Sequence, residues 1–152
     1  MISLAFKNAD KAGGFFSKAI KWKTGGPFSH VELWLSGTIY NAHCFSSREP
    51  KGTGFTQLDL RDKDLWTIVD LPGLTPAQEH DINVWCVGCG KKEYDFLGIL
   101  GFVWPFGEVH DDSDLFCSEC CTLCLQQVLG WFPGVKSYKT SPVKLYEMVK
   151  RP

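Results

Sequence analysis

The sequence has no run of about 18 to 20 apolar residues, the length that a helix needs to cross a bilayer. The apolar stretch at residues 96–106 is interrupted by Gly98, Gly101 and Pro105. The N-terminus lacks the charged start and the long apolar run of a secretory signal. We therefore expect a cytoplasmic protein without a transmembrane segment.

The sequence also lacks an excess of basic residues. Its 16 Lys and Arg residues are balanced by 17 Asp and Glu residues, so the formal net charge is -1. Proteins that bind duplex nucleic acid neutralise many phosphates, and this chain does not carry the charge to do so. We therefore expect no nucleic-acid partner.

A fully paired set of disulfides is excluded, because the chain has 7 cysteines and an odd thiol would remain. We interpret the thiols as reduced, which is the usual state in the cytoplasm. What is present is the composition of an ordinary globular protein, with 44% hydrophobic and 22% charged residues among 152. This length predicts a single domain that spans residues 1–152.

Hydrophobic periodicity predicts an α+β fold, with antiparallel strands between helices. The predicted strands cover residues 1–6, 29–35, 38–45, 55–60 and 65–71, with a polar loop at 46–54 and an edge strand at 135–139. The predicted helices cover residues 15–22, 76–88, 94–100 and 120–129, with a last helical turn at 141–146. Thr75 followed by Pro76 is typical of a helix start.

Residues 29–35 alternate in the manner of a strand, with His30 and Glu32 on one face. Residues 35–39 predict a tight turn into the next strand, so the two strands are expected to form a hairpin. Antiparallel neighbours bring side chains to within roughly 5 Å of each other. We therefore expect Asn41 or His43 to stand beside His30.

Cys117 follows a polar run at residues 110–114 and opens an apolar segment. Ser113 or Asp114 is the expected N-cap of a helix there, which places Cys117 in the first turn. Free backbone N–H groups and the positive end of the helix dipole favour a thiolate at that position. The backbone N–H of Cys117 is also a candidate donor to an oxyanion.

A cysteine nucleophile needs a base, and His30 is the best candidate in the chain. Asn41, or alternatively His43, is the candidate third residue that orients the imidazole. A simpler interpretation is that Cys117 only packs in the core. Cys120, Cys121 and Cys124 share its helix face, and for these three we expect that role alone.

Two C-x-x-C pairs, at residues 86–89 and 117–120, leave open a zinc-structured interaction domain. Both pairs fall on predicted helices, however, whereas structural zinc pairs favour tight turns. We therefore expect no bound metal and no cofactor.

The chain resembles the permuted papain-like cysteine hydrolases, the bacterial and viral amidase group related to NlpC-type peptidases and more distantly to lecithin retinol acyltransferase. The matching segments are residues 27–33 (PFSHVEL), 39–42 (IYNA), 94–96 (YDF), 116–119 (FCSE) and 141–145 (SPVKL). The resemblance implies a small, partly barrel-like antiparallel sheet packed on the cysteine helix, with His30 as base and Cys117 as nucleophile.

The resemblance further implies an enzyme that cleaves an amide or ester bond through a thioacyl intermediate, on cell-wall-type peptides or lipid acyl groups. Tyr94 is a candidate substrate contact, as is Glu32, which shares a face with His30 and otherwise faces solvent. The family pattern has Glu or His where this chain has Asn41, so a catalytically silent binding module of the same fold is the alternative.

Overall fold

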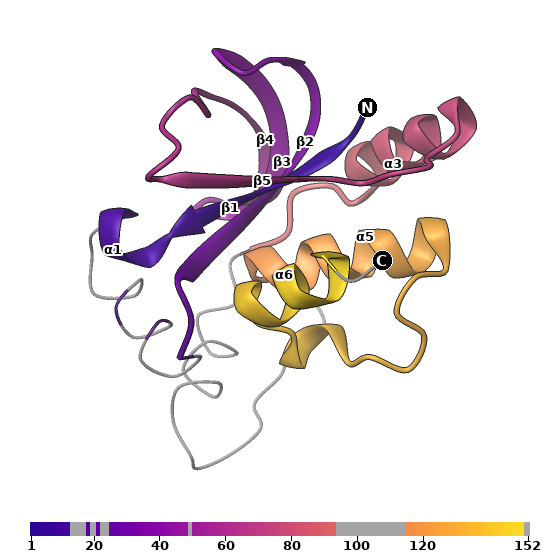
Figure 1. The fold of residues 1–152 in the computed structure, drawn as a ribbon. Coiled ribbons are helices and arrows are strands. Elements are labelled where there is room, and N and C mark those ends of the chain that lie inside the picture. Colours follow the sequence, from indigo (N-terminus) through magenta and orange to yellow (C-terminus); the bar gives the residue numbers. More distant parts are fainter. Residues whose placement is uncertain (13–17, 19–20, 22–24, 49, 94–114, 151–152) are drawn as a thin grey trace.

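The computed structural model describes residues 1–12, 18, 21, 25–48, 50–93 and 115–150. These residues form an antiparallel sheet with helices packed against one face, so the α+β prediction is confirmed (Figure 1). The predicted helices at residues 15–22 and 94–100 fall largely or entirely outside the described residues, as do Tyr94 and the proposed capping residues 113 and 114.

The sheet has five strands in the order β4-β3-β2-β1-β5. The strands are β1 (Ser3–Asn8), β2 (Phe28–Thr38), β3 (Asn41–Arg48), β4 (Gly52–Leu58) and β5 (Trp66–Asp70). Every pairing between neighbours is antiparallel. The sheet ends at β4 on one side and at β5 on the other, so it is open and not a closed barrel.

The β2–β3 hairpin turns later than the sequence predicts. β2 runs through Gly37 to Thr38, and the turn lies at residues 39–40. A β-bulge between Trp34 and Ser36 and a positive φ of 90° at Gly37 carry the strand past the predicted turn. A Cβ at Gly37 would approach the Asn41 carbonyl oxygen to 2.4 Å, so this position requires glycine.

Two further predictions are wrong. The predicted polar loop at residues 46–54 contains the end of β3 and the start of β4, because Ser46 and Ser47 are fully buried strand residues. The predicted edge strand at residues 135–139 is instead a short 3-10 helix, η1 (Ser137–Lys139). The short helix α1 (Ala9–Ala12), which follows β1, was not predicted.

Helix α3 (Pro76–Gly88) begins where Thr75 and Pro76 predict. The Thr75 hydroxyl accepts a hydrogen bond from Gln78 N–H over 3.2 Å, and the Gln78 side chain accepts one from Thr75 N–H over 2.9 Å. This reciprocal capping box fixes the start of α3. The last helix, α6 (Pro142–Lys150), is longer than the single predicted turn.

Helix α5 (Cys117–Leu129) begins at Cys117, so the first-turn position predicted for this cysteine is confirmed. Its N-cap is Phe116, which makes no side-chain capping hydrogen bond, and not Ser113 or Asp114. The helix ends at Gly130, whose φ of 67° is the left-handed conformation that commonly terminates helices.

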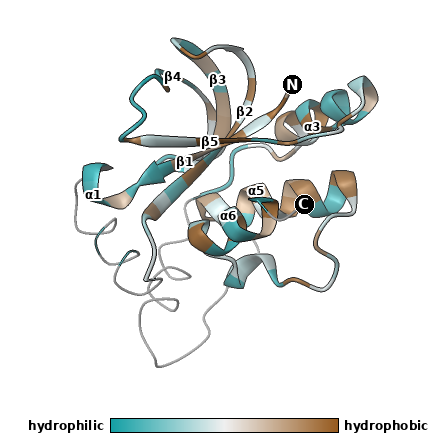
Figure 2. Ribbon diagram, viewed as in Figure 1, coloured by the Kyte–Doolittle hydropathy of each residue, from teal (hydrophilic) through white to brown (hydrophobic). Residues whose placement is uncertain are grey.

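The main core lies between the sheet and helices α3, α5 and α6. Hydrophobic residues run along the strands and along α5 (Figure 2). Cys120, Cys121 and Cys124 are fully buried in this core, as predicted. A smaller cluster around Cys44 and Trp66 covers the opposite sheet face. In the part of the chain that the structure describes, no helix is both long and apolar enough to span a membrane.

Candidate active site

His30 of β2 and Cys117 of α5 meet where the helix begins against the sheet. The Cys117 side chain forms a hydrogen bond with His30 and acts on it as a neighbouring charge. Cys117 is 3% exposed, and the His30 side chain is 19% exposed. The fold therefore brings together the two residues that the sequence singled out.

The charge state of His30 follows from its neighbours. Burial alone would lower the pKa of His30, but the Cys117 charge and hydrogen bond, together with the Glu32 carboxylate, raise that pKa to about 10. An imidazole in this setting is an imidazolium at neutral pH. Such a cation beside a sulfur favours the thiolate over the thiol.

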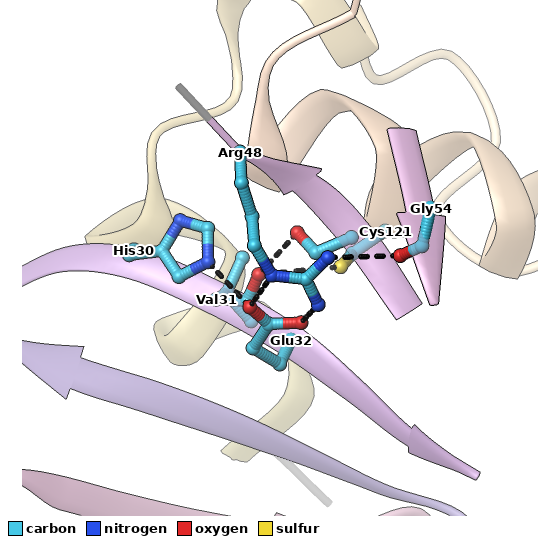
Figure 3. A network of polar contacts seen from close by, with 7 residues as sticks. His30, Val31, Glu32, Arg48, Gly54 and Cys121 are labelled. Atoms are coloured by element: carbon cyan, nitrogen blue, oxygen red, sulfur yellow. Dashed lines mark hydrogen bonds and ion pairs between the residues drawn. The ribbon is translucent and has the colours of Figure 1, made fainter. Parts of the chain in front are cut away.

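Glu32 lies next to His30 and is the residue that orients its ring. The His30 Nε2–H group donates a hydrogen bond of 2.7 Å to Glu32 Oε1 (Figure 3). Because Nε2 is occupied, Nδ1 is the ring nitrogen left for the Cys117 sulfur. The Glu32 side chain is only 2% exposed, and its carboxylate is bound by His30 and Arg48, which leaves it little surface for the substrate contact that the sequence suggested.

Arg48 of β3 holds the Glu32 carboxylate from the other side (Figure 3). Its Nε–H donates to Glu32 Oε1 over 2.7 Å, and its Nη2 donates to Glu32 Oε2. Its Nη1 donates to the Gly54 carbonyl oxygen on β4 over 2.9 Å. A bidentate arginine of this kind fixes a carboxylate in one orientation.

Asn41 and His43 do not stand beside His30, so the predicted third residue is wrong. The register pairs Asn41 with Thr38 and His43 with Ser36, at the far end of the hairpin. Both are exposed, and the Gln57 side chain donates to His43 Nε2 over 3.1 Å. The bulge and the later turn account for the displacement, because the prediction placed the turn before Thr38.

The start of α5 offers backbone donors at the sulfur. Its first helical hydrogen bond runs from Cys120 N–H to the Phe116 carbonyl oxygen over 2.9 Å. The Cys117 N–H therefore precedes the helical hydrogen-bond ladder. Phe116 gives no side-chain cap at this end of the helix, where the dipole is positive.

The zinc alternative required Cys117 and Cys120 to act together with Cys86 and Cys89. In the structure Cys117 contacts His30, whereas Cys120 contacts Cys89. Across the described ranges, no group of three or more His, Cys, Asp or Glu side chains is arranged to hold a metal ion. This arrangement gives no support to a zinc-structured domain.

Sequence reasoning missed the roles of Glu32 and Arg48. The spacing of His30 and Glu32 carried a usable signal, because residues two apart on a strand share one face. Arg48 carried none, since its contact with Glu32 depends on the pairing of β2 with β3. No model of a known protein family matches this chain, and no curated protein matches its sequence.

Proposed function

We propose that the protein is a cysteine hydrolase that cleaves an amide or ester bond, with Cys117 as nucleophile and His30 as acid and base. The observation that carries the proposal is the contact of His30 with Cys117 at the start of α5, backed by Glu32 on the other ring nitrogen. Thiol hydrolases need a nucleophile, a base that contacts it and a third group that orients the base.

In the proposed reaction the Cys117 thiolate attacks the carbonyl carbon, and the backbone N–H of Cys117 stabilises the oxyanion. His30 gives its proton to the leaving amine or alkoxide, which produces a thioacyl enzyme. His30 then takes a proton from water, which attacks the thioester and releases the acid. An acceptor other than water would make the same intermediate an acyl donor.

Glu32 and Arg48 serve this reaction as positioning residues. Glu32 keeps the imidazole ring in one orientation and stabilises its cation, and Arg48 holds the Glu32 carboxylate in place. The four groups alternate in sign, from the Cys117 sulfur through His30 and Glu32 to Arg48. The paired state therefore has no net charge, which favours it at a largely buried site.

We further propose that the fold is a permuted papain-like fold. The resemblance supports this, because the histidine precedes the cysteine and the cysteine helix packs on an antiparallel sheet. In this proposal Glu32, and not Asn41, is the third residue that orients the His30 imidazole. Cell-wall-type peptides and lipid acyl esters are the substrate classes to screen.

Alkylation by iodoacetamide tests the proposal without a known substrate. An ordinary thiol has a pKa near 8.5 and is less than about 1% thiolate at pH 6. We expect Cys117 to be alkylated at about pH 6 roughly 100-fold faster than such a thiol. Mass spectrometry of the modified peptides measures the rate, and Cys117→Ser should remove it.

Cys121→Ser is the matched control, because Cys121 lies on the same helix and is fully buried. Burial holds the pKa of the Cys121 thiol well above its usual range, so its removal should leave the fast reaction intact. Alkylation of Cys117 that rises only near the pH of an ordinary thiol would contradict the proposal.

A catalytically silent binding module is the second candidate, and the burial of Cys117 favours it. At 3% exposure, the described residues leave little open surface at the sulfur. The alkylation experiment separates the two candidates, because an enclosed and inert Cys117 would react neither at low pH nor at neutral pH.

A further inference from the structure

Helices α3 and α5 pack against each other (Figure 1). Four thiols other than Cys117 meet at this interface. Cys86 and Cys89 lie at the C-terminal end of α3, and Cys120 and Cys124 lie on α5. Side-chain hydrogen bonds join them across the interface in two pairs, Cys89 with Cys120 and Cys86 with Cys124. All four are free thiols.

The two pairs differ in their access to solvent. Cys86 and Cys124 are 1% and 0% exposed, so that pair is sealed in the core. Cys89 is only partly buried, whereas its partner Cys120 is fully buried. The Cys89–Cys120 pair therefore joins a partly exposed cysteine to a fully buried one.

The backbone around Cys89 is held in place by β4. Thr53 Oγ1 donates to the Gly90 carbonyl oxygen over 2.8 Å and accepts from Lys92 N–H over 2.7 Å. Thr53 N–H donates to the Lys92 carbonyl oxygen over 2.9 Å. These bonds hold the backbone that directly follows Cys89 against β4.

The thiols of this pair also differ in acidity. The hydrogen bond with Cys120, opposed by partial burial and helped by Lys92 and Thr53, lowers the pKa of Cys89 to about 7. The same hydrogen bond and burial raise the pKa of Cys120 well above its usual range. Near neutral pH a sizeable share of Cys89 is therefore thiolate, whereas Cys120 stays a thiol.

We propose that Cys89 and Cys120 form an oxidation site, at which a hydroperoxide produces a disulfide between α3 and α5. The Cys89 thiolate attacks the peroxide oxygen, the O–O bond breaks, and the leaving oxygen takes a proton, which leaves Cys89 as a sulfenic acid. The Cys120 sulfur then attacks the Cys89 sulfur and expels the hydroxyl group, which leaves as water with the Cys120 proton. Two thiols and one peroxide give one disulfide, with the peroxide reduced.

The bond would tie the end of α3 to the first turns of α5, the helix that begins at Cys117. It would close residues 89–120 into a loop and so raise the thermal midpoint of unfolding of the oxidised protein. This inference does not rest on the proposed hydrolase, because it uses neither Cys117 nor His30.

Treatment of the full chain with equimolar hydrogen peroxide tests the site. The Cys117→Ser background removes the competing thiol, so failure here is distinguishable from failure of the hydrolase proposal. Tryptic mapping without reduction should join residues 64–91 to residues 93–136 with the loss of two hydrogens. Because residues 64–91 hold both Cys86 and Cys89, variants must assign the bond.

Cys89→Ser should abolish the linked peptide, and Cys86→Ala should retain it. The peroxide-treated protein should also unfold at a higher temperature than the untreated one, and dithiothreitol should reverse the shift. A linked peptide that survives Cys89→Ser overturns the proposal. So does a chain in which Cys89 reaches the sulfinic acid, or resists oxidation altogether, without a bond to Cys120.

Discussion

The two ends of the β2–β3 hairpin carry similar groups in opposite settings. At one end His30, Glu32 and Arg48 form a buried chain of contacts next to Cys117. At the other end His43 contacts Gln57.

Near that far end an exposed Arg61 pairs with Asp59 and stacks over Tyr40. Each region therefore has a histidine and an arginine–carboxylate pair.

Burial is what separates the two ends. The Glu32 side chain is 2% exposed, whereas Asp59 is 47% exposed. Water replaces the partner of an exposed charge at little cost, but nothing replaces the partner of a buried one. Loss of one partner should therefore cost stability at the first end and little at the second, although the residue types are the same.

Replacing each of the two histidines by alanine gives the largest expected contrast, in the alkylation rate of Cys117. His30→Ala should slow alkylation of Cys117 at about pH 6 by roughly 100-fold, because the thiolate loses its cation. His43→Ala is the matched control and should leave the rate unchanged. Peptide mass spectrometry after timed quenching measures both, and equal losses would show that the far end also acts on the sulfur.

Removing the two arginines gives a smaller contrast, in stability. Arg48→Met should lower the free energy of unfolding by about 3 kcal/mol, because it leaves the Glu32 carboxylate buried with a reduced set of donors. Arg61→Met should change little, since its pair is exposed. Urea denaturation followed by circular dichroism measures both variants.

The double variant Glu32→Gln with Arg48→Met checks the cause of that loss. It removes the buried charge together with its partner, so it should recover part of the stability lost in Arg48→Met alone. A double variant that is less stable than either single variant would mean that packing, and not charge, holds this site together.

The last expected contrast is in pH dependence. The pKa of His30 is raised to about 10 in the folded state from an ordinary value near 6.5. Its contribution to stability is therefore fully present below about pH 6.5 and is lost as the pH rises toward about 10.

The stability advantage of the parent chain over His30→Gln should accordingly shrink by more than about 1 kcal/mol between about pH 6 and pH 9. Urea titrations across that range measure it. The advantage over His43→Gln should stay flat, and a matching decline there would assign the effect to the hairpin in general.

The sequence predicted the elements of this site better than their pairing. Alternation at residues 29–35 and the break before Cys117 placed His30 on a strand and Cys117 at a helix start. The Ser36–Gly37 pair predicts a turn, because local sequence does not distinguish a tight turn from a glycine that accommodates a bulge.

A hairpin that turns a few residues later changes every cross-strand neighbour. This is why Asn41 was expected beside His30, and why Arg48, assigned to a loop, was overlooked. The short helix η1 escaped prediction for a similar reason, because an apolar segment of that length is compatible with a strand or a helical turn.

The bond from Arg48 to the Gly54 carbonyl oxygen joins the buried charges to β4, which is an edge strand. Edge strands detach from a sheet at lower free energy than the strands inside it. Fraying of β4 would remove the Gly54 acceptor that helps to hold Arg48 against Glu32, while the helices stay folded. On warming, the alkylation rate of Cys117 would then fall before the protein unfolds as a whole. The reactivity of Cys117 would thus report the loss of β4 at a lower temperature than the circular dichroism of the helices does.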